Sequence, residues 1–255
     1  MQRIDDSRID LTFYPSAGDR PRGAVIVCPG GGYAVLAAHE AEPIARWLNA
    51  AGLPAFVLRY RVAPHRHPAA LDDVSRAVRL VRARAAEFGV RPDRIAVLGF
   101  SAGGHLVTTL ATHHDAGDER AADPVERVSC RPDAVVACYP VVSLRQFAHP
   151  GCIANLLGEH PTDEVLDDLS NEQHAAPDTP PMFLWHTASD QTVPVEHSLL
   201  MAGALRDQRV PFELHVFPHG PHGLGLCDGS SPVGRTETVA QWTRLCERWL
   251  ASLRF

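Results

Sequence analysis

The sequence predicts an α/β fold, in which a mostly parallel sheet carries helices on both faces. Two observations predict it. Short apolar runs alternate with longer segments of helical periodicity. The runs also show little polar alternation, which is typical of parallel strands buried on both faces. They are residues 24–28, 55–58, 95–98, 134–139, 182–185 and 214–217.

The chain has 255 residues, of which 45% are hydrophobic and 21% charged. This composition supports one large core and argues against intrinsic disorder. We therefore expect a single domain over 1–255. Residues 143–181 break the strand–helix alternation and contain several turn residues. We expect them to form a lid inserted over the strand ends.

The sequence also predicts an edge strand and two helices outside the central apolar runs. Ile9, Leu11 and Phe13 alternate with other residues, which predicts a half-exposed edge strand, antiparallel to the rest. Apolar residues recur at spacings of three and four over 68–88, which predicts an amphipathic helix that ends at Gly89. A similar pattern over 239–249 predicts a last helix.

Charge and cysteine content exclude several classes of function. The net charge of -6 argues against nucleic acid as a partner, and all 24 basic residues are arginines, which excludes a catalytic lysine. The six cysteines form no CxxC pair, and nothing in the sequence requires a disulfide. Neither a signal segment nor a run of about 18 apolar residues is evident, so we expect a cytoplasmic protein without membrane contact.

A candidate nucleophile stands between a predicted strand and a predicted helix. Residues 99–103 read Gly-Phe-Ser-Ala-Gly, directly after the apolar run 95–98 and before a helical stretch over 104–113. The GxSxG pattern in this context is typical of a nucleophile elbow, a sharp turn that exposes the serine above the sheet. Ser101 is therefore the predicted nucleophile.

A glycine-rich loop follows the first run of the core. Residues 29–33 read Pro-Gly-Gly-Gly-Tyr, whose spacing does not fit a dinucleotide-binding GxGxxG motif. Such a loop can present backbone N–H groups to an oxyanion, together with the residue after the nucleophile. We expect Gly31, Gly32 and Ala102 to form the oxyanion hole, without deciding between the two glycines. Tyr33 is a candidate substrate-binding residue, with a purely packing role as the alternative.

The acid and the base are expected after the next strands. Asp190 follows the run 182–185, with an N-terminal helix cap as its alternative role. Two histidines follow the run 214–217, and we favour the glycine-flanked His222 over His219 as the base. His105 is expected to pack behind the elbow. Residues 113–115, His-His-Asp, suggest a metal, but adjacent residues point to different helix faces, so we expect no metal and no cofactor.

The chain resembles the α/β-hydrolases along nearly its whole length. Within them it is similar to the carbohydrate-esterase branch, with acetyl xylan esterases and bacterial feruloyl-esterase-like proteins, which are related to hormone-sensitive lipase. The segments that carry the resemblance are 28–33, 58–64, 99–105, 155–158, 179–181, 186–190 and 221–226. Lipase relatives have histidine where Pro29 stands, which favours the esterase branch. The resemblance implies the same triad: Ser101, Asp190 and His222.

Together these observations predict a metal-free serine esterase. We expect it to hydrolyse short acyl esters, chiefly acetyl, on xylo-oligosaccharides or related sugars, and self-association is left open. The alternatives are a general carboxylesterase or an arylformamidase on the same fold. A catalytically inactive binding protein is a further alternative, against which the presence of His222 argues.

Overall fold

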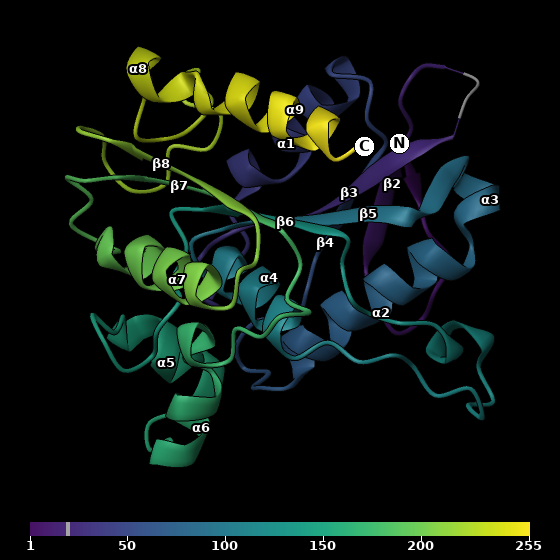
Figure 1. Ribbon diagram of the computed structural model, residues 1–255, viewed down its shortest axis with the longest axis horizontal. Coiled ribbons are helices and arrows are strands. Elements are labelled where there is room, and N and C mark those ends of the chain that lie inside the picture. Colours follow the sequence, from purple (N-terminus) through teal and green to yellow (C-terminus); the bar gives the residue numbers. More distant parts are fainter. Residues whose placement is uncertain (19–20) are drawn as a thin grey trace.

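The computed structural model describes residues 1–18 and 21–255 (Figure 1). Their strands form one sheet in the order β1-β2-β4-β3-β5-β6-β7-β8, and β3 to β8 run parallel. This confirms the predicted α/β class. The strands are β1 (Gln2–Arg3), β2 (Leu11–Tyr14), β3 (Arg22–Cys28), β4 (Ala55–Leu58), β5 (Val90–Phe100), β6 (Ala134–Cys138), β7 (Met182–Thr187) and β8 (Phe212–Phe217).

One prediction about the sheet is wrong. β2 is antiparallel to its neighbours, as expected, but it is not the edge strand. The two-residue strand β1 pairs with it through Gln2 and Arg3 and takes the edge position. Leu11 is fully buried and Phe13 stacks on Phe56 of β4, so the strand belongs to the core.

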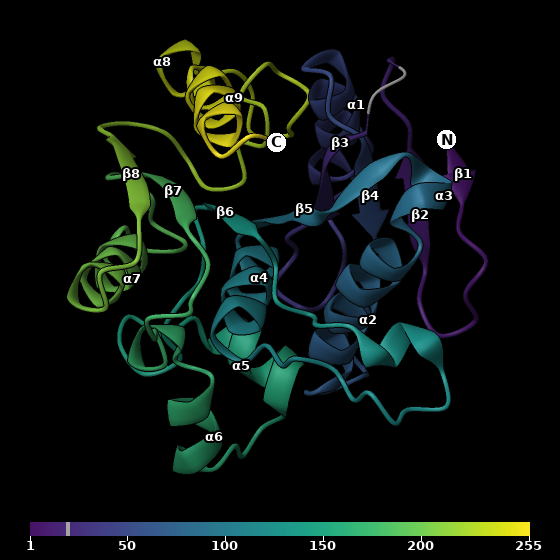
Figure 2. The ribbon, with the colours of Figure 1, turned by 45° about the vertical axis from the view of Figure 1, so that its right-hand side comes forward.

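Helices cover both faces of the sheet (Figures 1 and 2). α2, α4 and α7 pack on one face, and α1, α8 and α9 on the other. The α-helices are α1 (Glu42–Ala50), α2 (Ala69–Ala83), α3 (Ala85–Phe88), α4 (Ala102–Thr112), α5 (Pro150–Leu157), α6 (Asp163–Asp168), α7 (Glu196–Asp207), α8 (Glu237–Ala240) and α9 (Trp242–Ser252). Short 3-10 turns are η1 (Ala38–Glu40), η2 (Pro124–Arg127) and η3 (Asn171–Gln173).

The predicted helix over 68–88 is two helices, α2 and α3, separated at Arg84. The pair ends at Gly89 as predicted, because φ of +63° there is a left-handed conformation that favours glycine. The last predicted helix is likewise divided, into α8 and α9.

The core has two halves, one on each face of the sheet. Successive residues of β5 alternate between them: Val97 packs under α2 and α4, whereas Leu98 faces the α1 and α9 side. On that second side Trp242 of α9 stacks on Trp185 of β7, with ring centroids 5.2 Å apart. Burial of each such large apolar side chain stabilises the fold by about 1.5–3 kcal/mol.

All six cysteines are buried and reduced. In the described part of the chain, no helix is both long and apolar enough to cross a bilayer.

The parallel strands direct their carboxyl ends to one edge of the sheet. The loops after β3, β5, β6, β7 and β8 therefore meet there, although they come from distant parts of the sequence. This edge holds the predicted site residues.

Candidate active site

The turn between β5 and α4 holds Ser101 in an uncommon backbone conformation. Its φ is +52° and its ψ is -116°, outside the regions that L-residues usually occupy. The turn can be this sharp because Gly103 lacks a side chain: a Cβ there would lie 2.2 Å from the carbonyl oxygen of Cys28. The serine thus stands between the sheet and the first turn of α4, next to the loop after β3.

Ser101, His222 and Asp190 form a continuous hydrogen-bonded chain. The Oγ of Ser101 lies 2.8 Å from Nε2 of His222, and Nδ1 of His222 lies 2.7 Å from Oδ2 of Asp190. An ionised carboxylate can only accept, so Nδ1–H of the imidazole donates to it. Nε2 then carries the lone pair and accepts the hydroxyl proton of the serine. His219 is exposed and takes no part in this chain.

The surroundings of Asp190 keep its carboxylate ionised. The side chain is buried, and its Oδ1 accepts hydrogen bonds from the backbone N–H groups of Thr192 and Val193 at 2.9 and 3.0 Å. Burial raises the pKa of Asp190, but the His186 and His222 rings beside it lower that pKa more, to well below the usual range. A permanent negative charge therefore faces the imidazole.

The glycine-rich loop lies against the elbow and presents unpaired amides. Gly31 has a φ of +126°, which glycine tolerates and other residues rarely adopt. Within residues 1–18 and 21–255, the N–H groups of Gly31, Gly32 and Ala102 donate no hydrogen bond. Gly30 is different, because its N–H donates to the buried carboxylate of Glu40 at 2.7 Å.

Glu40 and Tyr139 support the site, although no motif in the sequence indicated them. Besides Gly30, Glu40 accepts the hydroxyl of Tyr139 at 2.6 Å, and that hydroxyl in turn accepts the N–H of Gly225 at 2.9 Å. The Tyr139 ring meets His222 edge to face, with centroids 5.0 Å apart. One buried carboxylate thus connects the glycine-rich loop to the wall behind the imidazole.

Tyr33 is buried rather than open to a pocket. Its ring is 2% exposed, and its hydroxyl lies 2.8 Å from Nδ1 of His105. Nε2 of His105 donates to the carbonyl of Leu169 at 2.9 Å, and burial lowers the pKa of His105 to about 4. This placement fits the packing alternative for Tyr33 and the packing role expected of His105.

Comparison with known proteins places the chain in a family. It matches the BD-FAE family over residues 9–205. It is 39% identical to endo-1,4-beta-xylanase B of Butyrivibrio fibrisolvens over 86% of this chain and 35% of that protein. It is 31% identical to acetylxylan esterase of Xylanibacter ruminicola over 87% of this chain and 45% of that protein. The chain therefore spans less than half the length of these two curated relatives.

Solved structures agree with this placement. The acetyl ester-xyloside bifunctional hydrolase of Caldicellulosiruptor lactoaceticus superposes with a TM-score of 0.92 at 52% identity, covering 96% of this chain and 88% of that one. A sugar hydrolase of Lactococcus lactis superposes with a TM-score of 0.81 at 28% identity, covering 97% and 95%. These findings confirm the resemblance to the carbohydrate-esterase branch. The chain belongs to the BD-FAE family of α/β-hydrolases and is similar to acetylxylan esterases.

Proposed function

We propose that this chain is a serine esterase that removes short acyl groups, chiefly acetyl, from xylo-oligosaccharides or related sugars. The observation that carries the proposal is the pair of short contacts at His222, 2.8 Å to Ser101 and 2.7 Å to Asp190. Two relatives support the substrate class, one named an acetylxylan esterase and the other an acetyl ester-xyloside hydrolase.

In the proposed mechanism Ser101 is the nucleophile and His222 the general base. Nε2 takes the hydroxyl proton as Oγ attacks the ester carbonyl, and the carbonyl π electrons move onto oxygen to give a tetrahedral oxyanion. Asp190 holds the ring and stabilises the imidazolium by its charge. When the C–O bond breaks, Nε2–H protonates the departing alcohol and leaves an acyl-enzyme.

The oxyanion is held by the amides of Gly31, Gly32 and Ala102 in this proposal. Unpaired N–H groups suit the role because they need not break an internal hydrogen bond to accept the developing charge. Removal of one such donor typically costs about 10²- to 10³-fold in kcat. Water activated by His222 then attacks the acyl-enzyme, and the carboxylic acid and free Ser101 are restored. No step uses a metal or a cofactor.

The surface next to the base suits a sugar as the leaving group. A hollow with a volume of about 390 Å³ borders His222, and its lining includes the polar residues Ser189, Gln191 and Thr192. The alcohol must leave beside Nε2, since that nitrogen protonates it. Hydroxyl and amide side chains there can hydrogen-bond to sugar hydroxyls.

We further propose that residues 143–181 shape the substrate site as a lid. Asn155 of α5 donates from Nδ2 to the carbonyl of Gly32 at 2.9 Å, so the segment touches the glycine-rich loop. Arg145 pairs with Asp163 and Asp167 of α6, and His149 caps α5. These polar residues hold the segment together, so the contact made by Asn155 carries the lid proposal.

A substrate panel tests the proposed preference. We expect kcat/KM to fall from acetyl through butyryl to octanoyl p-nitrophenyl esters, and acetate to be released from acetylated xylobiose. Methyl ferulate and N-formylkynurenine should be poor substrates. A preference that rises with acyl length, without release of acetate from the sugar, would contradict the carbohydrate-ester proposal. Faster turnover of N-formylkynurenine would indicate the arylformamidase alternative.

A further inference from the structure

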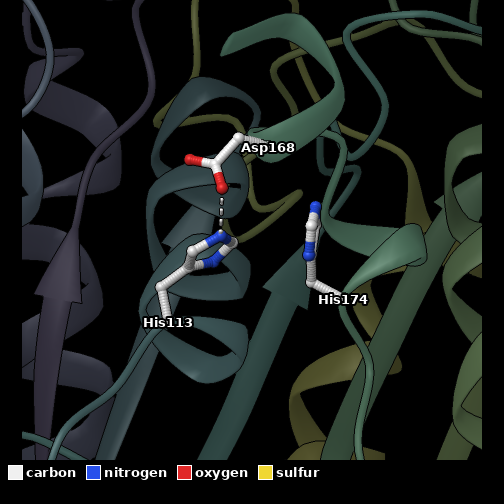
Figure 3. Close-up of side chains that lie close together, drawn as sticks. All are labelled: His113, Asp168 and His174. Carbon is white, nitrogen blue, oxygen red and sulfur yellow. Dashed lines mark ion pairs between the residues drawn. The ribbon is translucent and has the colours of Figure 1, made fainter. Parts of the chain in front are cut away.

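A second histidine–aspartate group lies outside the triad, at the far end of α4. His113 follows the last residue of α4, Asp168 is the last residue of α6, and His174 follows η3 (Figure 3). One ligand atom from each side chain lies within 4.8 Å of the other two. Since α4 has eleven residues, this group is about 16 Å along the helix from Ser101.

The hydrogen bonds of the two rings leave one nitrogen of each facing the group. Nδ1 of His113 lies 2.8 Å from the hydroxyl oxygen of Thr112 and 3.2 Å from the carbonyl of Thr109. The Thr112 hydroxyl has its own acceptor in the carbonyl of Thr108 at 3.1 Å, so both neighbours can accept from Nδ1–H, and the lone pair is then on Nε2. Nε2 of His174 lies 3.0 Å from the carbonyl of Asp167, so its lone pair is on Nδ1. A backbone carbonyl that fixes the tautomer in this way is the usual support of a histidine that binds a metal.

Nε2 of His113 is buried and has no hydrogen-bond partner among the described residues. Its neighbour Oδ1 of Asp168 is 3.5 Å away, beyond an ordinary N–H···O hydrogen bond. Two ligands bound tetrahedrally to Zn²⁺ at about 2.0–2.1 Å lie about 3.3 Å apart. The pair thus already has metal-ligand spacing, and the ligand atom of His174 lies within 4.8 Å of both.

The surroundings favour a cation. The carboxyl-terminal end of α4 carries the negative end of the helix dipole, and Asp168 adds a full negative charge. Asp168 is largely exposed, which gives a metal ion and a coordinating water a way in. Two imidazoles with one carboxylate suit Zn²⁺ and similar transition metals, whereas Mg²⁺ and Ca²⁺ prefer oxygen ligands throughout.

We propose that Nε2 of His113, Nδ1 of His174 and the carboxylate of Asp168 bind one Zn²⁺ ion, with water as the fourth ligand. The ion would join α4 to the segment 143–181, which contributes two of the three ligands. This site is structural and is separate from the proposed catalytic chemistry.

The test measures Zn²⁺ binding to the tag-free full chain after treatment with a chelator, since a histidine tag would itself bind the metal. Calorimetry should give one Zn²⁺ per chain, and Co²⁺ should give the visible d–d absorption of a tetrahedral site. At about 100 times the Kd, Zn²⁺ should raise Tm by about 5 °C, and Mg²⁺ should not.

Matched variants locate the site among the 14 histidines. His174→Ala, at a partly buried position, and Asp168→Asn, at an exposed one, should each weaken Zn²⁺ binding at least tenfold and remove the Co²⁺ spectrum. His114→Ala is the control: it is adjacent to His113 but faces Asp178, so it should bind like the parent. Folding of each variant is checked by circular dichroism. Absence of stoichiometric binding, or equal binding by His174→Ala and the parent, would overturn the proposal.

Discussion

The two histidine–aspartate groups near the ends of α4 differ in how their polar atoms are satisfied. In Ser101, His222 and Asp190, each reacting atom has a partner within 2.8 Å, and the remaining carboxylate oxygen accepts two amides. In the second group Nε2 of His113 has no hydrogen-bond partner among the residues that the structure describes, and only Oδ1 of Asp168 lies near it, at 3.5 Å. Histidine and aspartate side chains therefore occur here in two arrangements, one fully hydrogen-bonded and one not.

The two groups differ in whether every polar atom has a hydrogen-bond partner. In a fully hydrogen-bonded triad the imidazole can take the proton of the serine while the carboxylate stays ionised, so only the substrate is needed for reaction. A group that leaves a buried lone pair unpaired costs free energy until a ligand occupies it. We infer that the first group is ready to react and that the second awaits a metal ion. Four predictions test this distinction.

The largest effect is expected at the nucleophile. Ser101→Ala should lower kcat for p-nitrophenyl acetate by about 10⁴- to 10⁶-fold, because no other group can form the acyl-enzyme. Circular dichroism and Zn²⁺ binding should match the parent, since the hydroxyl supports neither the core nor the second group. More than a few per cent of parental activity in pure protein would contradict the role of Ser101.

The second-largest effect is expected at the general base, His222. His222→Ala should lower kcat by about 10⁴-fold or more, because the proton of Ser101 then has no acceptor. His219→Ala serves as the matched control and should remain within about twofold of the parent, as its side chain is exposed. The opposite pattern in the same assay would mean that His219 is the base.

Acid should destabilise the fold, because two buried histidines, His105 and His197, resist protonation in the folded state. Burial lowers the pKa values of His105 and His197 to about 4, below the ordinary value of about 6.5. Both must stay neutral in the folded state, so stability is fully present above pH 6.5 and is lost as the pH falls towards 4. Each contributes roughly 3 kcal/mol over that range.

Urea unfolding at pH 7, 5.5 and 4.5 measures this loss. His105→Gln should reduce the slope of unfolding free energy against pH by up to about 1.4 kcal/mol per pH unit. An equal slope in parent and His105→Gln would show that His105 does not resist protonation.

The smallest effect on catalysis is expected from chelation. EDTA should leave the initial rate at 25 °C unchanged, because the proposed mechanism contains no metal, but should lower the Tm of Zn²⁺-loaded protein. A loss of activity that Zn²⁺ restores would place a metal in the reaction itself.

The sequence predicts the fold well because strands buried on both faces must be apolar along their whole length, which marks them in the sequence. Strands such as Ala55–Leu58 are continuous apolar runs between turns, and their boundaries follow from that pattern alone. The edge position of the sheet could not be predicted, since Gln2–Arg3 has no apolar pattern and forms a strand only by pairing with β2.

The site is predictable where a residue follows a strand or lies in a motif. Ser101, Asp190 and His222 each stand in a loop after a recognisable strand. Glu40 and the grouping of His113 with His174 could not be found in this way. Their partners are distant in sequence or in separate loops, and only the packing of the loops brings them together.

The most direct test of the account is covalent labelling of the nucleophile. A fluorophosphonate reacts with an activated serine when Oγ attacks phosphorus and fluoride leaves. Peptide mass spectrometry of the labelled full chain should find one adduct, on Ser101. The substitution His222→Ala should slow formation of this adduct at least 100-fold. Zn²⁺ bound at the second group should leave the adduct on Ser101. Ester hydrolysis by a protein that carries its label on another serine, or on none, would contradict the central claim.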